Sequence, residues 1–256
     1  MSSTDPIPFS PTLNAHSFLK PEIIFESPEI MAVNKPSGLL TLPDRFDGEL
    51  QSLRGLLIKY HGHAYTIHRL DRDTSGLIIF GKTLEAQQHY TKQFEERKVE
   101  KTYLGLVMGR MEQESGTLDQ PIAEHPSVKG KMSVQRQGRY AVTHFTLLET
   151  FSKYSLLSFR IETGRTHQIR VHMHNAGHPI ACDPIYGNGA PILLSAIKKN
   201  FNLAKSADEE RPLLNRLALH AWRLSLEDMQ GNLLQLEAPL PKDMDACLKQ
   251  FRKWSS

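Results

Sequence analysis

Short apolar runs bounded by glycine, proline or polar residues recur along the first two thirds of the chain. The clearest is the run LIIF at 77–80, which lies between Gly76 and Gly81. Four residues are too few for a helix that sustains itself, so this run predicts a buried strand. Strands are predicted in the same way over residues 23–25, 30–33 and 103–108. Apolar residues that alternate with polar ones over 157–162 predict a strand with one buried face.

Helical spacing marks two further segments. Residues 84–97 are rich in good helix formers, and Thr83 stands where an N-cap residue is expected. After Pro241, Met244, Leu248 and Phe251 recur at helical spacing, which predicts a closing helix that packs on the core. Strands and helices together predict a mixed sheet with attached helices.

A third helix is predicted over Thr166–Ala176. Ile169 and Met173 are four residues apart, and Gly177 follows the segment as a common helix stop. In such a helix His167, Arg170 and His174 share one face.

Composition predicts one catalytic domain. The chain has 256 residues, of which 39% are hydrophobic and 23% charged, enough for one substantial core. Four prolines and several serines in residues 1–22 predict a tail that lies over the domain, and residues 23–256 then form the domain itself. Residues 195–211, rich in Lys, Asn and Glu, predict an exposed helical insertion.

Charge and cysteine usage narrow the functional classes. The net charge is only +3, so an RNA-binding surface requires local clustering of basic residues. Cys182 and Cys247 belong to no C-x-x-C unit, which argues against a disulfide framework or a cysteine zinc site. No leader-like segment or apolar run near the ~20 residues of a membrane span is present. We expect a soluble, cytoplasmic monomer.

The densest polar cluster is the sequence HRLDRDTSG at 68–76, directly before the apolar run. Loops of this kind on a rigid scaffold commonly carry function. Asp71 lies between Arg69 and Arg72, and flanking positive charge keeps a carboxylate ionised even when it is partly desolvated. Such a group can serve as nucleophile or base. The structural alternative is an aspartate in a surface ion pair.

The same residues carry a family resemblance. The pattern H-R-L-D-R-x-T-S-G resembles the signature of the RluA branch of the pseudouridine synthases. The sequence GRTHQIRVH at 164–172, followed by GHPI at 177–180 and by Asp183, is similar to a second motif of that family. Weaker similarities are KTY at 101–103 and NKPSG at 34–38. The resemblance covers roughly residues 23–240.

The resemblance implies a fold and a reaction. The fold is the α+β pseudouridine synthase fold, with a mixed, largely antiparallel central sheet flanked by helices and loops. Asp71 would attack or deprotonate the target nucleoside so that the glycosidic bond breaks, uracil turns, and carbon 5 rejoins the ribose. The reaction needs neither a metal nor an organic cofactor.

The resemblance also implies roles for individual residues. Arg170 matches the arginine that pairs with the catalytic aspartate, a role suited to a bidentate guanidinium. Tyr103 matches the ring that packs on the flipped uracil, and Arg69 a residue that occupies the place the base has left. With Asp71, Tyr103 and Arg170 catalytic, we expect the substrate to be bound by a second set, Arg69, Arg72, Arg165 and His167.

Each of these residues has a structural alternative. Tyr103 could be a core aromatic of its strand, Arg170 a helix-surface arginine, and Arg165 a packing or phosphate-contacting arginine. The histidines His167, His172 and His174 suggest a metal site, but their spacing in a helix puts the second on another side, and no H-E-x-x-H occurs.

The partner is expected to be a ribosomal or transfer RNA stem-loop. Many relatives place a small RNA-binding domain ahead of the catalytic one, whereas the NKPSG segment here begins at residue 34. We therefore expect target selection to rest on the catalytic domain. Two other classes stay open: a non-catalytic RNA-binding or ribosome-assembly factor, and a metal-dependent hydrolase that uses the histidines.

Overall fold

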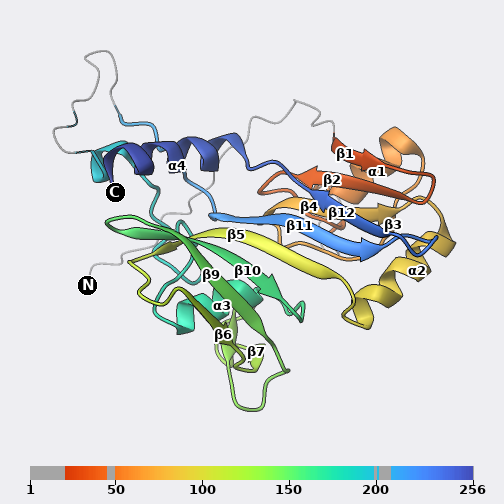
Figure 1. The fold of residues 1–256 in the computed structure, drawn as a ribbon, viewed down its shortest axis with the longest axis horizontal. Helices are drawn as coiled ribbons and strands as arrows, with labels where there is room; N and C mark the ends of the chain where they lie inside the picture. The colour runs from red at the N-terminus through yellow and green to blue at the C-terminus, as the bar shows by residue number, and fades with distance from the viewer. Residues whose placement is uncertain (1–20, 45–49, 199–200, 202–208, 256) are drawn as a thin grey trace, which may run out of the picture.

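The computed structural model describes residues 21–44, 50–198, 201 and 209–255. Within these residues the chain forms a 10-stranded sheet and a small 2-stranded sheet, drawn in Figure 1. The strands are β1 Glu22–Glu26, β2 Ile30–Lys35, β3 Tyr65–Thr66, β4 Ser75–Gly81, β5 Glu100–Met108, β6 Ser115–Leu118, β7 Ile122–Glu124, β8 Met132–Val134, β9 Thr143–Thr150, β10 Tyr154–Ile161, β11 Leu219–Glu227 and β12 Leu233–Glu237. The helices are α1 Leu53–His61, α2 Leu84–Glu95, α3 Gln168–Asn175 and α4 Lys242–Trp254, with a 3₁₀ turn η1 at Leu194–Ala196.

The large sheet is mixed and largely antiparallel, as predicted. Its strands follow the order β1-β2-β4-β11-β5-β10-β9-β6, with β12 beside β11 and β3 beside β4. Only β4 and β11 pair in parallel among the described strands. The sheet crosses the molecule from β1 and β2 at one end to β9 and β6 at the other (Figure 1). The α+β fold class is thus confirmed.

Strand β4 is buried along its whole length, which explains its continuous apolar sequence. Leu77 and Ile79 pack into the cluster that contains Tyr90 of α2. Ile78 and Phe80 belong to the cluster that contains Leu57 of α1. Because successive side chains of a strand point to opposite faces, α1 and α2 cover opposite faces of this part of the sheet.

The other end of the molecule has its own core. Ile169 and Met173 of α3 share a cluster with residues of β5 and β10 and with Leu248 and Phe251 of α4. Helix α4 lies along one edge in Figure 1, while α3 lies among β6, β9 and β10. The spacing that predicted a closing helix after Pro241 is confirmed.

The predicted helix boundaries hold to different degrees. Helix α2 begins after Thr83, whose side chain accepts from the amide of Ala86, so the predicted N-cap is confirmed. Helix α3 begins two residues later than predicted, because His167 adopts the left-handed region with φ 56°. The tail predicted over 1–22 lies outside the described residues except for its last two, and Glu22 already belongs to β1. Most of the insertion predicted over 195–211 also lies outside them.

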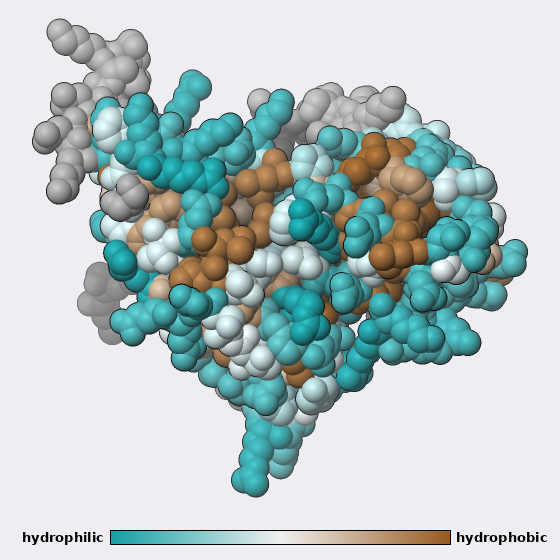
Figure 2. Space-filling view, viewed as in Figure 1, coloured by the Kyte–Doolittle hydropathy of each residue, from teal (hydrophilic) through white to brown (hydrophobic). Residues whose placement is uncertain are grey.

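The described helices include none long and apolar enough to cross a lipid bilayer. In the space-filling view, brown patches lie over the central part of the face shown (Figure 2). The projecting tip that carries the turn between β7 and β8 is hydrophilic by contrast.

Candidate active site

Strand register brings the Asp71 loop beside Tyr103. Gly76, which ends the polar block, pairs in parallel with Ala221 of β11, and Ala221 pairs with Tyr103 of β5. A Cβ on Gly76 would lie 2.1 Å from the Ala221 carbonyl oxygen, and the backbone of Gly76 has φ 111°. Only glycine permits both this approach and this conformation. The glycine of the motif therefore sets how closely β4 and β11 approach.

The Asp71 loop is braced from beneath by the NKPSG segment. Lys35 is fully buried, and its Nζ donates to the carbonyl oxygens of Pro36, Leu39 and Arg72 at 2.8–3.0 Å. Burial lowers the pKa of Lys35 to about 7, and the carboxylates of Asp73 and Asp71 oppose that shift. The lysine thus satisfies loop carbonyl groups that would otherwise be buried without donors.

One hydroxyl group and one imidazole ring complete the support. Thr41 Oγ1 donates to the Leu70 carbonyl oxygen at 2.9 Å and accepts from the Leu70 amide at 3.2 Å. His68 lies two residues before Leu70. Its Nε2 accepts from the Ile79 amide of β4 at 3.1 Å, and its imidazole ring stacks on Phe94 with the ring centres 4.4 Å apart. The first motif histidine therefore anchors the loop to the sheet.

The facing wall comes from the turn before α3. Buried Gln168 holds this turn: its Oε1 accepts from Thr163 Oγ1 at 2.7 Å and from the Arg165 amide at 3.0 Å. Its Nε2 donates to the Val142 carbonyl oxygen at 2.9 Å. The glutamine of the second motif is therefore a structural hub that fixes where Arg165 and His167 lie.

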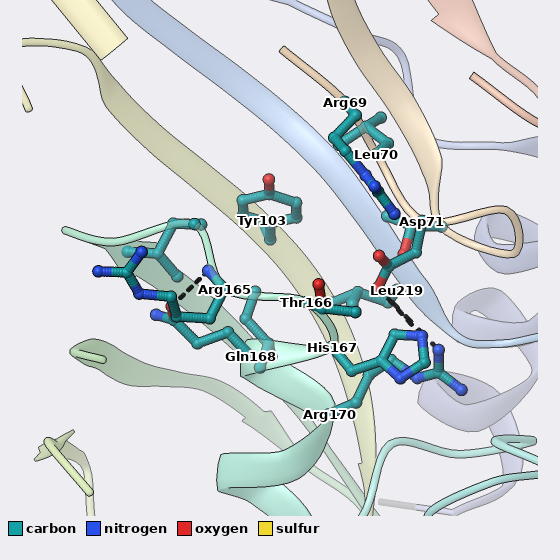
Figure 3. A pocket seen from close by; sticks show the side chains of 14 residues that line it. Arg69, Leu70, Asp71, Tyr103, Arg165, Thr166, His167, Gln168, Arg170 and Leu219 are labelled. Atoms are coloured by element: carbon teal, nitrogen blue, oxygen red, sulfur yellow. Dashed lines mark hydrogen bonds and ion pairs between the residues drawn. The ribbon is translucent and has the colours of Figure 1, made fainter. Parts of the chain in front are cut away.

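These walls enclose a pocket of about 130 Å³. This volume is near the ~150 Å³ of cavities that hold a benzene-sized ring. Figure 3 shows Asp71 and Tyr103 on different sides of it, with His167 and Arg170 near the carboxylate. The pocket is lined by residues of both motifs and of the three strands β5, β10 and β11: Arg69, Leu70, Asp71, Thr74, Tyr103, Ile161, Gly164, Arg165, Thr166, His167, Gln168, Ile169, Arg170 and Leu219.

Asp71 faces two nitrogen atoms without a short contact. Its Oδ2 lies 4.0 Å from Arg170 Nη1 and 4.0 Å from His167 Nε2, and the side chain is 20% exposed. Arg170 was expected to hold Asp71 in a bidentate pair, and this part of the prediction is wrong. Its Nε and Nη2 instead donate to Asp183 Oδ2 and Oδ1 at 2.7 and 2.8 Å.

The pair of Arg170 and Asp183 is held further by the backbone. Asp183 is fully buried, and its Oδ1 also accepts from the amides of Ile185 and Tyr186. Despite burial, hydrogen bonds and the charge of Arg170 lower the pKa of Asp183. The guanidinium is thereby fixed, and its remaining edge points toward Asp71.

The contact with Tyr186 favours one tautomer of His167. The Tyr186 hydroxyl oxygen accepts from the Met132 amide at 2.8 Å and lies 2.8 Å from His167 Nδ1. Since the described residues offer this hydroxyl no other acceptor, its hydrogen points to Nδ1, and the neutral imidazole carries its proton on Nε2. Burial lowers the pKa of His167, which favours that neutral form. An N–H group therefore faces Asp71.

Tyr103 lies across the pocket from these groups. Burial, and next the charge of Asp71, raise the pKa of its hydroxyl well above the ordinary value. The hydroxyl therefore stays protonated at neutral pH, and the ring offers a flat surface beside the carboxylate.

Comparison with known proteins agrees with this arrangement. A family model described as RNA pseudouridylate synthase matches residues 29–175, which include both motifs of the pocket. The chain belongs to this family. The RluA-type resemblance of the sequence is thereby confirmed.

Relatives of the chain include two bacterial proteins named ribosomal large subunit pseudouridine synthase D. That of Nitrosomonas europaea is 39% identical over 237 residues, which cover 90% of this chain and 65% of the relative. That of Haemophilus ducreyi is 37% identical over 227 residues, which cover 86% of this chain and 67% of the relative. The chain thus spans about two thirds of the length of these proteins. The solved structure of Human RNA Pseudouridylate Synthase Domain Containing 1 is 26% identical, with a TM-score of 0.70 over 95% of this chain and 91% of that one.

Of the four residues expected to bind substrate, the structure brings three to the pocket. Arg69, Arg165 and His167 line it. Arg72 lies outside, and its Nε donates to the Gly38 carbonyl oxygen at 3.1 Å. Its backbone carbonyl accepts from Lys35, so Arg72 joins the brace beneath the loop rather than the pocket wall.

The side chains predicted to share one face do lie together, although His167 precedes helix α3 and does not belong to it. Arg170 lies over the Tyr186 ring at 5.1 Å, and His167 and His174 contact the same ring, so the three share one face. His172 points elsewhere, to Thr143 Oγ1 and the Gln120 carbonyl oxygen. The described part of the chain contains no group of three or more His, Cys, Asp or Glu residues that could hold a metal ion.

Sequence reasoning missed three contributors to the site. These are Tyr186, Lys35 and Asp183. Each makes a contact with a residue that is 13 to 54 positions away in the sequence, so its role is visible only in the folded structure. A signal was present for Asp183, which follows the second motif, but nothing in the spacing indicated that it takes the guanidinium.

Proposed function

We propose that the chain is an RNA pseudouridine synthase that isomerises uridine to pseudouridine with Asp71 as its catalytic carboxylate. The observation that supports this most is the pocket itself. A partly exposed carboxylate faces a fixed guanidinium and an imidazole N–H, and an aromatic ring lies across from it. A non-catalytic RNA-binding factor would have no physical need to keep a buried Arg170–Asp183 pair aimed at Asp71.

The reaction is an internal rearrangement in which no atom is gained or lost. The bond between ribose C1′ and uracil N1 breaks, the base turns, and a bond forms between C1′ and C5. The proton on C5 is lost and N1 gains one. Asp71 acts as nucleophile or base, and its lack of short hydrogen bonds within the described residues leaves its lone pairs available.

In this proposal Tyr103 supports the flipped base by stacking. A tyrosinate would be needed for removal of the C5 proton by this residue, and the raised pKa of Tyr103 disfavours that form. In this proposal Arg170 supplies positive charge and His167 an N–H donor, each 4.0 Å from the carboxylate, and the two orient Asp71. In this proposal Arg69, which is exposed and lines the pocket, enters the space that the base leaves.

The substrate is proposed to be ribosomal RNA, in a stem-loop. The support is that the relatives at 37–39% identity are named as large ribosomal subunit enzymes. Transfer RNA is the alternative substrate. Comparing pseudouridines in total RNA from cells with and without the gene distinguishes the two.

The deciding experiment is Asp71→Asn. The change is nearly isosteric and removes only the anion, so isomerisation should be abolished while RNA affinity stays within a few-fold of the wild type. Asp73→Asn is the matched control, because Asp73 lies in the same loop but outside the pocket. Wild-type turnover by Asp71→Asn would make the proposed mechanism wrong.

A further inference from the structure

Three arginines from separate segments meet around Tyr140. Arg165 Nε donates to the Tyr140 carbonyl oxygen at 3.0 Å. The Arg97 guanidinium lies 5.5 Å from the centre of the Tyr140 ring, and Arg139 is the preceding residue. Arg97 follows α2, Arg139 follows the β7–β8 hairpin, and Arg165 precedes α3. The cluster is therefore created by the fold rather than by a basic run in sequence.

These arginines have no carboxylate partner among the residues that the structure describes. Four other arginines do form such pairs: Arg170, Arg216, Arg223 and Arg252. Glu162 is a nearby acid, and His144 contacts it at 2.7 Å, which is the largest cause of its lowered pKa. The charges of Arg160 and Arg97 lower that pKa less, and neither arginine forms an ion pair with Glu162. The three guanidinium groups thus leave several N–H donors unused.

The positive charges also act on one another. Burial lowers the pKa of Arg165 first, and the charges of Arg139 and Arg97 lower it further. Such repulsion is relieved when an anion binds between the guanidinium groups. Phosphate oxygens suit this role, because the planar fork of arginine matches their geometry.

The backbone at Arg97 adds an independent indication. Arg97 lies just beyond the end of α2 with φ 58°, a left-handed conformation that glycine usually takes at helix ends. A non-glycine residue there costs about 1 kcal/mol, and strain of this kind concentrates at functional positions. The chain has an arginine here despite this strain, and its side chain lies over the Tyr140 ring.

We propose that Arg97, Arg139 and Arg165 form a binding site for a phosphodiester of the RNA strand beside the flipped nucleotide. This inference rests on the proposed RNA substrate. Arg165 lines both the catalytic pocket and the cluster, which places the bound phosphate next to the target nucleotide. The contact is with the backbone, so it positions the RNA and reads no base.

The test measures RNA affinity as a function of salt. The probe is a labelled RNA hairpin with a uridine in its loop, and the protein is the full chain carrying Asp71→Asn. Arg139→Gln and Arg165→Gln are each added to it. Each should weaken binding by about tenfold. Each should also reduce the slope of log affinity against log salt by about 0.7 to 0.9.

Two further variants separate a phosphate site from general charge. Arg110 is an exposed arginine that follows β5, whereas Arg97 precedes that strand. Arg110→Gln should leave both the affinity and the salt slope unchanged. Arg165→Lys keeps the charge but loses the fork, so the salt slope should be retained while affinity falls. Thermal melts check that every variant is folded.

The outcomes distinguish this inference from the proposed function. An unchanged slope in Arg139→Gln and Arg165→Gln, or an equal change in Arg110→Gln, overturns the phosphate site. The arginine substitutions should weaken binding of a hairpin with a scrambled loop sequence by the same factor. A loss confined to one loop sequence also overturns the phosphate site. A different result would count against the proposed reaction and leave the phosphate site standing. In that case the salt slopes change as predicted, but the wild-type protein makes no pseudouridine.

Discussion

Asp183 accepts both short hydrogen bonds of the Arg170 guanidinium, while Asp71 lies 4.0 Å from the same group. Arg170 is 2% exposed and Asp183 is fully buried. A pair buried in this way is costly to break, because removing one partner leaves the other charge without compensation. Arg170 therefore lies between two aspartates. Asp183 fixes its orientation, and its Nη1 atom faces Asp71.

This relationship predicts different outcomes for two substitutions of Arg170. Arg170→Lys keeps a charge near Asp183 but cannot reproduce the fork, so the protein should fold and lose much of its rate. Arg170→Met leaves Asp183 buried and unpaired, and should lower the free energy of unfolding by about 3–5 kcal/mol. Urea unfolding and single-turnover rates measure the two effects separately. Equal stability of wild type and Arg170→Met would contradict the buried pair.

The hydroxyl of Tyr186 is predicted to fix the proton on His167. Tyr186→Phe removes the donor to Nδ1, so the imidazole should lose its strong preference for the Nε2–H form, and the rate should fall. Nitrogen-15 NMR of the histidine ring reports the tautomer directly. Tyr154→Phe, which removes a half-buried hydroxyl in the other core, is the control. A pure Nε2–H signal in both variants would argue against the assignment.

Local signals in the sequence predicted several elements well. The apolar run of β4 and the Thr83 cap of α2 depend on neighbouring residues, and both are observed. Helix α1 was missed although its signals were present: Ser52 caps it, Leu53, Leu56 and Leu57 form its buried face, and Gly62 ends it in the left-handed conformation. The helix has only nine residues, and Gly55 within it is a poor helix former, so these signals were too few to be recognised in the sequence.

The site was predictable in its residues and less so in its contacts. The two motifs indicated Asp71 and Arg170, the weaker KTY similarity indicated Tyr103, and the structure places all three at one pocket. The partner of Arg170 was not predictable, because Asp183 approaches only after the chain leaves α3 and turns. Nor does the sequence indicate that His167 leaves the helical conformation. These features arise from packing between segments.

The activity is predicted to persist in excess chelator without added nucleotide or redox cofactor. The proposed rearrangement is redox-neutral, and the residues proposed for it are an acid, an arginine, a histidine and a tyrosine. Pseudouridine formation is measured before and after extensive treatment with chelator, with the RNA refolded identically in both samples. Complete loss that zinc restores would transfer support to a metal-dependent hydrolase.

Two histidines, the buried His220 and the half-buried His68, predict a loss of stability in mild acid. Burial lowers the pKa of His220 to about 4 and that of His68 to about 3. Between these values and the ordinary 6.5, the unfolded chain binds protons that the folded protein does not, so stability falls as pH falls. At pH 5 the loss is about 2 kcal/mol for each histidine.

The variant His220→Gln isolates one of these contributions. Because it removes the group that titrates on unfolding, the free energy of unfolding should fall less steeply between pH 6.5 and about 4 than in the wild type. Urea unfolding at several pH values gives the slope, and His63→Gln at an exposed position serves as the matched control. Identical slopes for His220→Gln and the wild type would contradict neutral burial of His220.

The last prediction concerns the RNA. A target uridine must leave its stack to reach a pocket bounded by Asp71 and Tyr103, and an unpaired loop base costs less to extrude than a base in a duplex. Proteins that recognise specific RNA sites mostly act on such loops. We therefore expect turnover to be fastest on a folded stem-loop, slower when mismatches open the stem, and slowest when the same uridine is paired. Measuring single-turnover rates on these three RNAs, at matched salt because phosphate contacts depend on it, separates recognition of shape from recognition of sequence. Restoring the stem with a different set of base pairs should restore the rate. Equal rates on the folded and opened RNAs would show that the fold of the RNA contributes nothing to recognition.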